Sequence, residues 1–172
     1  MIETERLKIV PFDEPHFQAI FNKDLIELGR LLDINPPKSW TTFEDMKDAL
    51  PFFYEDFKKN GSLWGGYFTV HKADNCLIGT CGYKSKPDTE GVVEIGYEVA
   101  EGYRLRGIAS EITKVLTDFA LKNASVNTVR AHTLAHNNPS VSVLVKNGYR
   151  LMGLFHEPDD GDVWRWEVYR KE

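Results

Sequence analysis

The sequence has few cysteines, no long hydrophobic run and no excess of positive charge. Its 172 residues include 2 cysteines and carry a formal net charge of −5. The apolar runs fall far short of the roughly 20 residues that a membrane-spanning helix needs. The acidic balance argues against general nucleic-acid binding and mildly suits a cationic substrate such as an amine. Met1–Glu5 has neither the basic nor the apolar part of a secretory signal, so we expect a cytoplasmic protein.

Motifs for metal and nucleotide binding are also lacking. Cys76 and Cys81 are five residues apart, a spacing that puts their side chains on opposite faces of an unbroken strand. We therefore expect two reduced, packed thiols and no metal site. There is no Gly-x-x-x-x-Gly-Lys-Ser/Thr loop and no Gly-x-Gly-x-x-Gly turn, so the nucleotide binders that use these motifs have little support.

Hydrophobic periodicity predicts a single α+β domain over residues 1–172. Helix signals predict one helix from a cap at Asp13 to about Leu32, and a second that starts at a Thr41–Glu44 capping box and is kinked or broken near Leu50 by Pro51. Two further helices are expected over 107–123 and 139–147. Alternating patterns predict a mixed sheet of about seven strands, flanked by these helices, over 6–12, 63–71, 76–85, 92–100, 128–135, 149–157 and 162–170. The strand–helix–strand order from 92 to 135 indicates a parallel crossover.

The segment Arg104–Ala109 follows an apolar strand and opens an amphipathic helix. The start of a helix has unpaired N–H groups and the positive end of a dipole, so it attracts phosphate. Gly107 lets the backbone approach an anion, and Ala109 keeps the first turn slim. Arg104 and Arg106 can clamp phosphate oxygens. The segment therefore predicts a pyrophosphate-binding site.

Arg104-x-x-Gly107-x-Ala109 is similar to the Q/R-x-x-G-x-G/A signature with which the GCN5-related N-acetyltransferases (GNAT family) bind coenzyme A. Glu3–Leu7, Glu94–Tyr97 and Asn137–Ser140 stand in an order that resembles the subgroup of the ribosomal-protein N-terminal acetyltransferases. The resemblance covers essentially the whole chain. It implies the family's α+β fold, with acetyl-CoA as cosubstrate. It also implies direct transfer of the acetyl group to a primary amine of a small molecule or a protein N-terminus.

The same resemblance implies which groups hold the cosubstrate. Backbone groups of Val99 and Ala100 are expected to bond the pantetheine amides, and the Val99 N–H to lie near the thioester oxygen. The side chain of Asn137 is expected to bond the pantetheine arm. The phosphates are expected at a cradle made of Arg104, Leu105, Arg106, Gly107, Ile108, Ala109 and Ser110.

Acetyl transfer to an amine needs a base, because an ammonium has a pKa of about 10 in water. Glu94 is our first candidate, acting through water, since relatives place a catalytic glutamate at the similar position. His132 is the second, because a neutral imidazole takes up a proton near neutral pH. Many relatives carry a tyrosine acid where this sequence has Leu144. We therefore expect Ser140 to donate to the departing thiolate, the alternative at this point being a helix N-cap formed by a neighbour.

The missing tyrosine leaves a second class of function open, a non-catalytic acyl-CoA-binding sensor on the same fold. Trp164 and Trp166 share one face of the last expected strand, where they belong to the core, to a homodimer interface or to the acceptor pocket. The aromatic cluster within residues 52–57 is expected in the core, with a wall of the acceptor pocket as the alternative. No local motif identifies the acceptor amine, and we expect neither a nucleic-acid nor a membrane partner.

Overall fold

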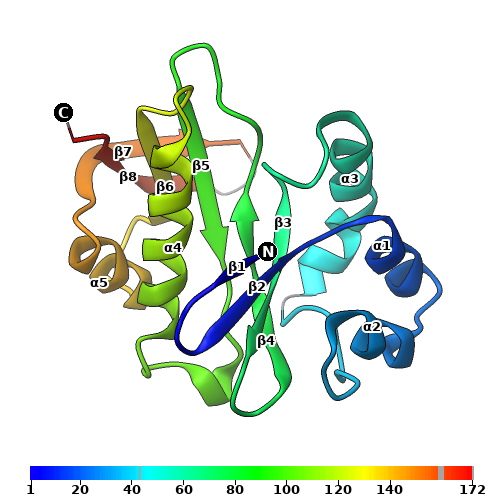
Figure 1. Ribbon diagram of the computed structural model, residues 1–172. Helices are drawn as coiled ribbons and strands as arrows, with labels where there is room; N and C mark the ends of the chain where they lie inside the picture. Colours follow the sequence, from blue (N-terminus) through cyan, green and yellow to red (C-terminus); the bar gives the residue numbers. More distant parts are fainter. Residues whose placement is uncertain (43, 159–160, 172) are drawn as a thin grey trace. The chain divides into compact units, whose positions relative to one another are not determined.

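The computed structural model describes residues 1–42, 44–158 and 161–171, which form eight strands and five α-helices (Figure 1). The strands belong to a mixed sheet, which confirms the α+β class with one strand more than the seven expected. The chain forms two compact units. The first unit contains residues 1–82 and 97–104, and the second contains residues 83–96 and 105–172.

The strands of the first unit form an antiparallel series in chain order. They are β1 (Ile2–Glu3), β2 (Leu7–Pro11), β3 (Gly66–His71) and β4 (Cys76–Tyr83). β2 pairs with β3 from Leu7↔His71 to Pro11↔Tyr67, and β3 pairs with β4 through a register shift at Thr69. β1 is the strand that the sequence did not predict, because two residues are too few to show an alternating pattern.

The single helix expected to run to Leu32 is in fact two helices, α1 (Glu14–Phe21) and α2 (Leu25–Leu32). Lys23 adopts the left-handed conformation (φ 56°) between them. The Asp24 carboxylate then accepts the N–H of Glu27 at 2.9 Å and caps α2. The prediction was wrong because the apolar stripe is nearly continuous through the break, whereas the turn depends on this local cap.

The predicted Thr41–Glu44 capping box of α3 (Glu44–Asn60) includes residue 43, so this prediction falls partly outside the described residues. The hydroxyl of Thr41 donates to the carboxylate of Glu98 at 2.9 Å. Of the kink or break expected near Leu50, the break does not occur, since the helix continues through Pro51. A proline inside a helix costs about 3 kcal/mol, and the buried face of a helix of this length offsets that cost.

The core of the first unit is aromatic. Phe12 stacks on Phe68 with ring centroids 4.0 Å apart and meets Phe17 edge-on at 5.6 Å. From the cluster at 52–57, the three side chains Phe53, Tyr54 and Phe57 pack against this core, as expected. The fourth, Phe52, is 77% exposed, so the core prediction fails for this side chain.

The second unit is a crossover followed by a hairpin. β5 (Val92–Tyr97) is parallel to β6 (Thr128–Leu134), with α4 (Ile108–Lys122) between them in the chain, which confirms the expected parallel connection. After α5 (Pro139–Lys146), β7 (Arg150–Glu157) and β8 (Gly161–Tyr169) form an antiparallel hairpin, and β8 also pairs with β6. The expected turn at 158–161 includes residues 159 and 160, which lie outside the described residues.

Aromatic side chains anchor the core of the second unit. Trp166 is 5% exposed, and its indole N–H donates to Thr133 Oγ1 at 3.1 Å. Tyr149 is equally buried and shares a 2.7 Å hydrogen bond with the hydroxyl of Thr117 in α4. Trp164 meets Trp166 edge-on at 6.4 Å. Of the three places expected for the tryptophans, Trp166 therefore occupies the core.

Candidate functional site

The N-terminus of α4 is shaped as an anion site. Its cap is Gly107, which is left-handed (φ 77°) and supplies no side-chain hydrogen bond to the first turn. The N–H groups of that turn therefore remain available as donors. Leu105, two residues earlier, is also left-handed (φ 59°) although its side chain is 98% exposed. That conformation costs a non-glycine residue about 1–2 kcal/mol. Because the Leu105 side chain is exposed, its packing does not offset this unfavourable backbone conformation.

The predicted cradle residues differ in what they expose. Ile108 is buried, so its side chain faces the core and only its backbone can reach a ligand. The Ser110 hydroxyl accepts a hydrogen bond from Asn147 Nδ2 at 3.0 Å, which links the first turn of α4 to the end of α5. Half-buried Ala109 and the exposed residues Leu105, Arg106 and Gly107 complete the turn in the second unit. Arg104 belongs to the first unit.

The strand segment that follows β5 exposes one particular N–H. In the first unit, Glu98 N–H donates to Thr80 O at 2.8 Å, and Ala100 N–H donates to Ile78 O at 2.7 Å. Because N–H groups alternate in direction along an extended strand, the N–H of Val99 points away from β4. The N–H of Ala100 is already bonded within the sheet. Of the two residues expected to meet pantetheine, Val99 therefore has its N–H directed outward.

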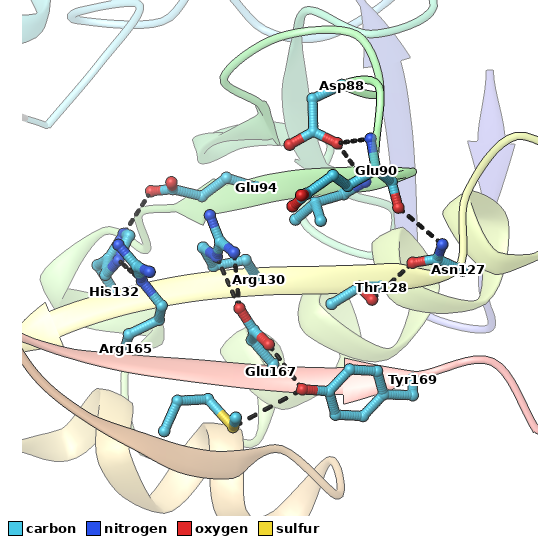
Figure 2. A network of polar contacts seen from close by, with 12 residues as sticks. Asp88, Glu90, Glu94, Asn127, Thr128, Arg130, His132, Arg165, Glu167 and Tyr169 are labelled. Carbon is cyan, nitrogen blue, oxygen red and sulfur yellow. Dashed lines mark hydrogen bonds and ion pairs between the residues drawn. The ribbon is translucent and has the colours of Figure 1, made fainter.

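Glu94 and His132, the two candidate bases, are hydrogen-bonded to each other in the second unit (Figure 2). His132 Nδ1 lies 2.9 Å from Glu94 Oε1, and Lys84 Nζ lies 2.5 Å from the same oxygen. Burial raises the pKa of Glu94, but the hydrogen bonds of His132 and Lys84 and the charge of Lys84 outweigh burial and hold the pKa below its usual range. Glu94 is therefore an ionised carboxylate at neutral pH.

The second nitrogen of His132 fixes the tautomer. Arg165 Nε lies 3.1 Å from His132 Nε2 and, as a guanidinium nitrogen, can only donate. Nε2 is thus the acceptor, and the proton of the neutral ring sits on Nδ1, where it donates to Glu94. Glu157 Oε1 lies 3.4 Å from Arg165. The imidazole is held between an acidic and a basic partner, with its lone pair occupied.

A second row of polar contacts lies beside this pair on the same strands (Figure 2). Arg130 Nε donates to Glu167 Oε1 at 2.8 Å, and Tyr169 Oη donates to Glu167 Oε2 at 2.7 Å. Burial raises the pKa of Glu167, but its bonds to Tyr169 and Arg130 outweigh burial and lower the pKa overall. Strand register explains the rows, because Arg130 pairs with both Glu94 and Glu167, and His132 pairs with Arg165.

The start of α5 shows which residue caps the helix. The Asn138 side chain accepts the N–H of Ser140 at 3.0 Å, so Asn138 caps the helix. A cap by a neighbour of Ser140 was the alternative that the sequence left open. The Ser140 hydroxyl is not needed for capping, and Ser140 is half-buried, whereas Asn137 is exposed. Leu144, at the position where many relatives have tyrosine, is 1% exposed. This side chain therefore belongs to the core and offers no proton donor.

A cavity of about 530 Å³ lies within the first unit, beside the ends of α1, α2 and α3. The residues that line it include the buried Ile20, Trp40 and Leu50, together with three lysines. None of the residues 52–57 is among its lining residues. The alternative role of that aromatic cluster as a pocket wall thus gains no support from this cavity.

The two cysteines are free thiols. Burial raises the pKa of Cys81 to about 12, although a hydrogen bond from Thr69 lowers it slightly. Cys76 is half-buried, with its sulfur 3.1 Å from Tyr103 Oη. Within residues 1–42, 44–158 and 161–171, no group of three potential metal ligands is found. In the same residues, no helix combines the length and apolar character that crossing a membrane requires.

The mixed sheet and the glycine-capped helix after β5 agree with the fold of an acetyltransferase of GNAT type, and comparison with known proteins shows the family. The family model of the acetyltransferase (GNAT) domain matches residues 6–150. The chain belongs to this family. YjdG of Bacillus subtilis (strain 168), an uncharacterized N-acetyltransferase, is 29% identical over 156 residues, which are 88% of this chain and 90% of that protein.

Solved structures share the fold at low sequence identity. The ribosomal-protein-S5-alanine acetyltransferase from Vibrio fischeri has a TM-score of 0.69 and 21% identity, covering 99% of this chain and 97% of that one. The spermidine N-acetyltransferase from Vibrio cholerae, in complex with CoA and spermine, has a TM-score of 0.65 and 15% identity, covering 97% of each chain. Membership of the GNAT family makes the protein an acyl-CoA-dependent acetyltransferase, while its assignment to the ribosomal-protein subgroup stays a prediction.

Sequence reasoning missed the partners of the two candidate bases. Lys84 could have been found from the hairpin that precedes Glu94, since the Lys84 N–H donates to Glu94 O at 2.9 Å. Arg165 and Glu157 had no such signal, because the pairing of β6 with β8 and of β7 with β8 brings them to His132 from more than twenty residues away in the sequence.

Proposed function

We propose that this protein moves an acetyl group from acetyl-CoA directly to a primary amine of a small molecule or of a protein N-terminus, with Glu94 as the general base. The observation that carries the proposal is the ionised, mostly buried Glu94 carboxylate, bonded to His132 and Lys84. A carboxylate in this state can accept the proton that an ammonium must lose before it attacks a thioester.

Glu94 is the better of the two candidate bases. The Nε2 lone pair of His132 is occupied by Arg165, and its Nδ1–H is directed at Glu94. Both ring nitrogens of His132 are therefore engaged by other side chains of the protein. Glu94 still has its second carboxylate oxygen, and it acts through one water in this proposal. His132 then serves to orient the base.

The cosubstrate would be held by backbone groups and a few side chains. The N–H groups from Gly107 to Ser110 would bind the diphosphate, with Arg104 and Arg106 alongside. The outward N–H of Val99 would donate to the thioester oxygen, where negative charge develops during attack. The exposed Asn137 amide would bond the pantetheine arm.

Departure of the thiolate is assigned to Ser140. Its hydroxyl is free of the capping role, which Asn138 fills, and the buried Leu144 cannot donate a proton. Direct transfer fits the state of the cysteines. A thiol whose pKa is raised to about 12 is protonated at neutral pH and is a poor nucleophile, so Cys81 is unsuited to an acyl-enzyme step.

The test is an amine panel offered together with acetyl-CoA. The panel contains polyamines, amino acids, aminoglycosides and short peptides with free N-termini. Free thiol is followed by colour, and each product is identified by its added acetyl mass. We expect thiol release that depends on one amine class. Tight acetyl-CoA binding without thiol release for any amine would instead identify an acyl-CoA sensor.

A further inference from the structure

Glu98 is a buried carboxylate that the proposed reaction leaves without a role. It is 5% exposed and belongs to the first unit. Its Oε1 accepts the hydroxyl of Thr41 at 2.9 Å and the hydroxyl of Thr80 at 2.8 Å. Its Oε2 accepts the N–H of Thr42 at 3.0 Å and, in addition, the Thr42 hydroxyl. These four donors are neutral, so hydrogen bonds from uncharged groups surround the carboxylate.

Stability alone is a weak reason to keep a carboxylate at this place. Removing such a group from water costs several kcal/mol, and hydrogen bonds to a charged acceptor contribute about 1.5–3 kcal/mol each. An apolar side chain of similar size would pack without that penalty, and such replacements of buried charges are often neutral or stabilising. The carboxylate differs from an apolar residue in one respect, which is that it joins several segments by directional bonds.

The segments that it joins are far apart in the sequence. Thr41 and Thr42 lie in the loop that enters α3, whereas Thr80 lies in β4. The main chain of Glu98 is also pressed against β4. A Cβ added to Gly79 would come within 2.3 Å of Glu98 O, so a glycine at 79 is what permits this close approach.

The residue held in place by these bonds is Val99. Its two neighbours donate their N–H groups to β4, and its own carbonyl accepts Arg104 Nε at 3.0 Å. The N–H of Val99, directed away from β4, is therefore fixed by main-chain bonds on both sides and by the Glu98 carboxylate. Its direction depends on how firmly the segment 98–100 is seated.

We propose that Glu98 is a positioning residue for acetyl transfer. Its carboxylate binds both the loop that enters α3 and strand β4, and these bonds hold Val99 so that its N–H keeps its direction. This inference rests on the proposed function, in which that N–H donates to the thioester oxygen. One donor of this kind contributes about 10²–10³ in kcat, and a misplacement of about 1 Å can cost a hundredfold. A Val99 N–H that is held less firmly should therefore lower kcat without altering the affinity for the phosphates of coenzyme A.

The variant Glu98→Gln tests the inference. The amide keeps the shape, but its NH₂ group turns a donor toward groups that are themselves donors. We expect kcat to fall about a hundredfold while the Kd for coenzyme A stays within twofold. In the infrared spectrum of bound acetyl-CoA labelled with ¹³C at the carbonyl, the thioester stretch should move toward its value in free acetyl-CoA, because a hydrogen bond has been lost.

Glu167→Gln is the matched control, since Glu167 is equally buried and is bonded to Arg130 and Tyr169. It should leave the infrared band and kcat nearly unchanged. Two variants of Thr41 give a milder test. Thr41→Val should lower kcat about tenfold, whereas Thr41→Ser should keep kcat close to that of the unaltered protein. This pair decides the matter if Glu98→Gln does not fold.

Failure of this inference and failure of the proposed function are distinguishable. If the unaltered protein releases no thiol with any amine, the proposed function falls, and the inference falls with it. If the unaltered protein turns over and Glu98→Gln does so equally well, only the positioning role is refuted. The role is also refuted if kcat falls while the thioester band stays in place, or if the valine and serine variants of Thr41 behave alike.

Discussion

Replacement of Glu94 by glutamine separates catalysis from stability. The amide has nearly the same shape as the carboxylate and still accepts the Nδ1–H of His132, but it cannot take up a proton. If Glu94 is the base, turnover should fall by about 10²–10⁴, which is the usual contribution of a positioned acid or base. The affinity for coenzyme A should not change, because no phosphate contact is assigned to this residue.

The cost of Glu94→Gln in stability should be small by comparison. The bond from His132 changes from charge-assisted to neutral, a loss of about 1 kcal/mol. The side chain of Lys84 is 56% exposed, so its ion pair with Glu94 is screened by solvent and contributes about 0–1 kcal/mol. An unfolding free energy reduced by about 1–2 kcal/mol still leaves the chain folded at 25 °C, so lost turnover would not reflect lost protein.

The assay is thiol release with the best amine of the panel, and Glu167→Gln is the control. The control makes the same chemical change on another strand of the second unit, β8, in a carboxylate whose partners are Arg130 and Tyr169. Turnover by Glu94→Gln that equals that of the unaltered protein at every pH would refute the assignment. The base would then be sought at His132.

The lowered pKa of Glu94 adds a test by pH. Its folded-state pKa lies below the unfolded value of about 4.3, so its stabilising contribution is fully present above that value and is lost as pH falls through the folded pKa. In kcat/KM, the acid limb due to Glu94 should accordingly lie below the ordinary carboxylate range. An acid limb centred near pH 6.5 would indicate an imidazole base.

Three further outcomes are expected. Gly107→Ala should weaken coenzyme A binding at least tenfold in calorimetry, because it strains a left-handed cap where phosphate must approach. Gly148→Ala is the control, because it places a similar backbone strain (φ 81°) at the end of α5 and should leave the affinity unchanged. Ser140→Ala should lower kcat about a hundredfold with little change in Tm. Asn138→Ala should instead lower the free energy of unfolding by about 1 kcal/mol, because the helix cap is lost. A loss of stability in Ser140→Ala together with a loss of kcat in Asn138→Ala would contradict both roles. Cys81 should resist thiol reagents at pH 8 until the protein unfolds, and rapid labelling in the native state would show that burial does not raise its pKa.

Local patterns predicted what depends on neighbours in the chain. The helix expected over 107–123 follows from the amphipathic run after Gly107, and the structure confirms it as α4. A cap of α5 by a neighbour of Ser140 was the alternative expected from the sequence, and Asn138 provides it. The break at Lys23 was missed, and of the kink or break expected at Pro51 the break does not occur, because each depends on a balance between a local turn or breaker and the burial of the flanking apolar face.

The sequence by itself determined most of the order of elements and predicted an anion-binding turn before α4, because periodicity, capping and glycine placement act over a few residues. Glu94 and His132 became candidates through the family resemblance and the chemistry of their side chains. Only the tertiary structure decided that these two side chains share one hydrogen bond, that Arg165 occupies the far nitrogen of the imidazole, and that Glu98 ties Thr41 and Thr42 to β4. The physical reason is register. Which side chains face each other across paired strands or a loop depends on contacts between segments that are distant in the chain, and a shift of one residue would point every one of them the other way.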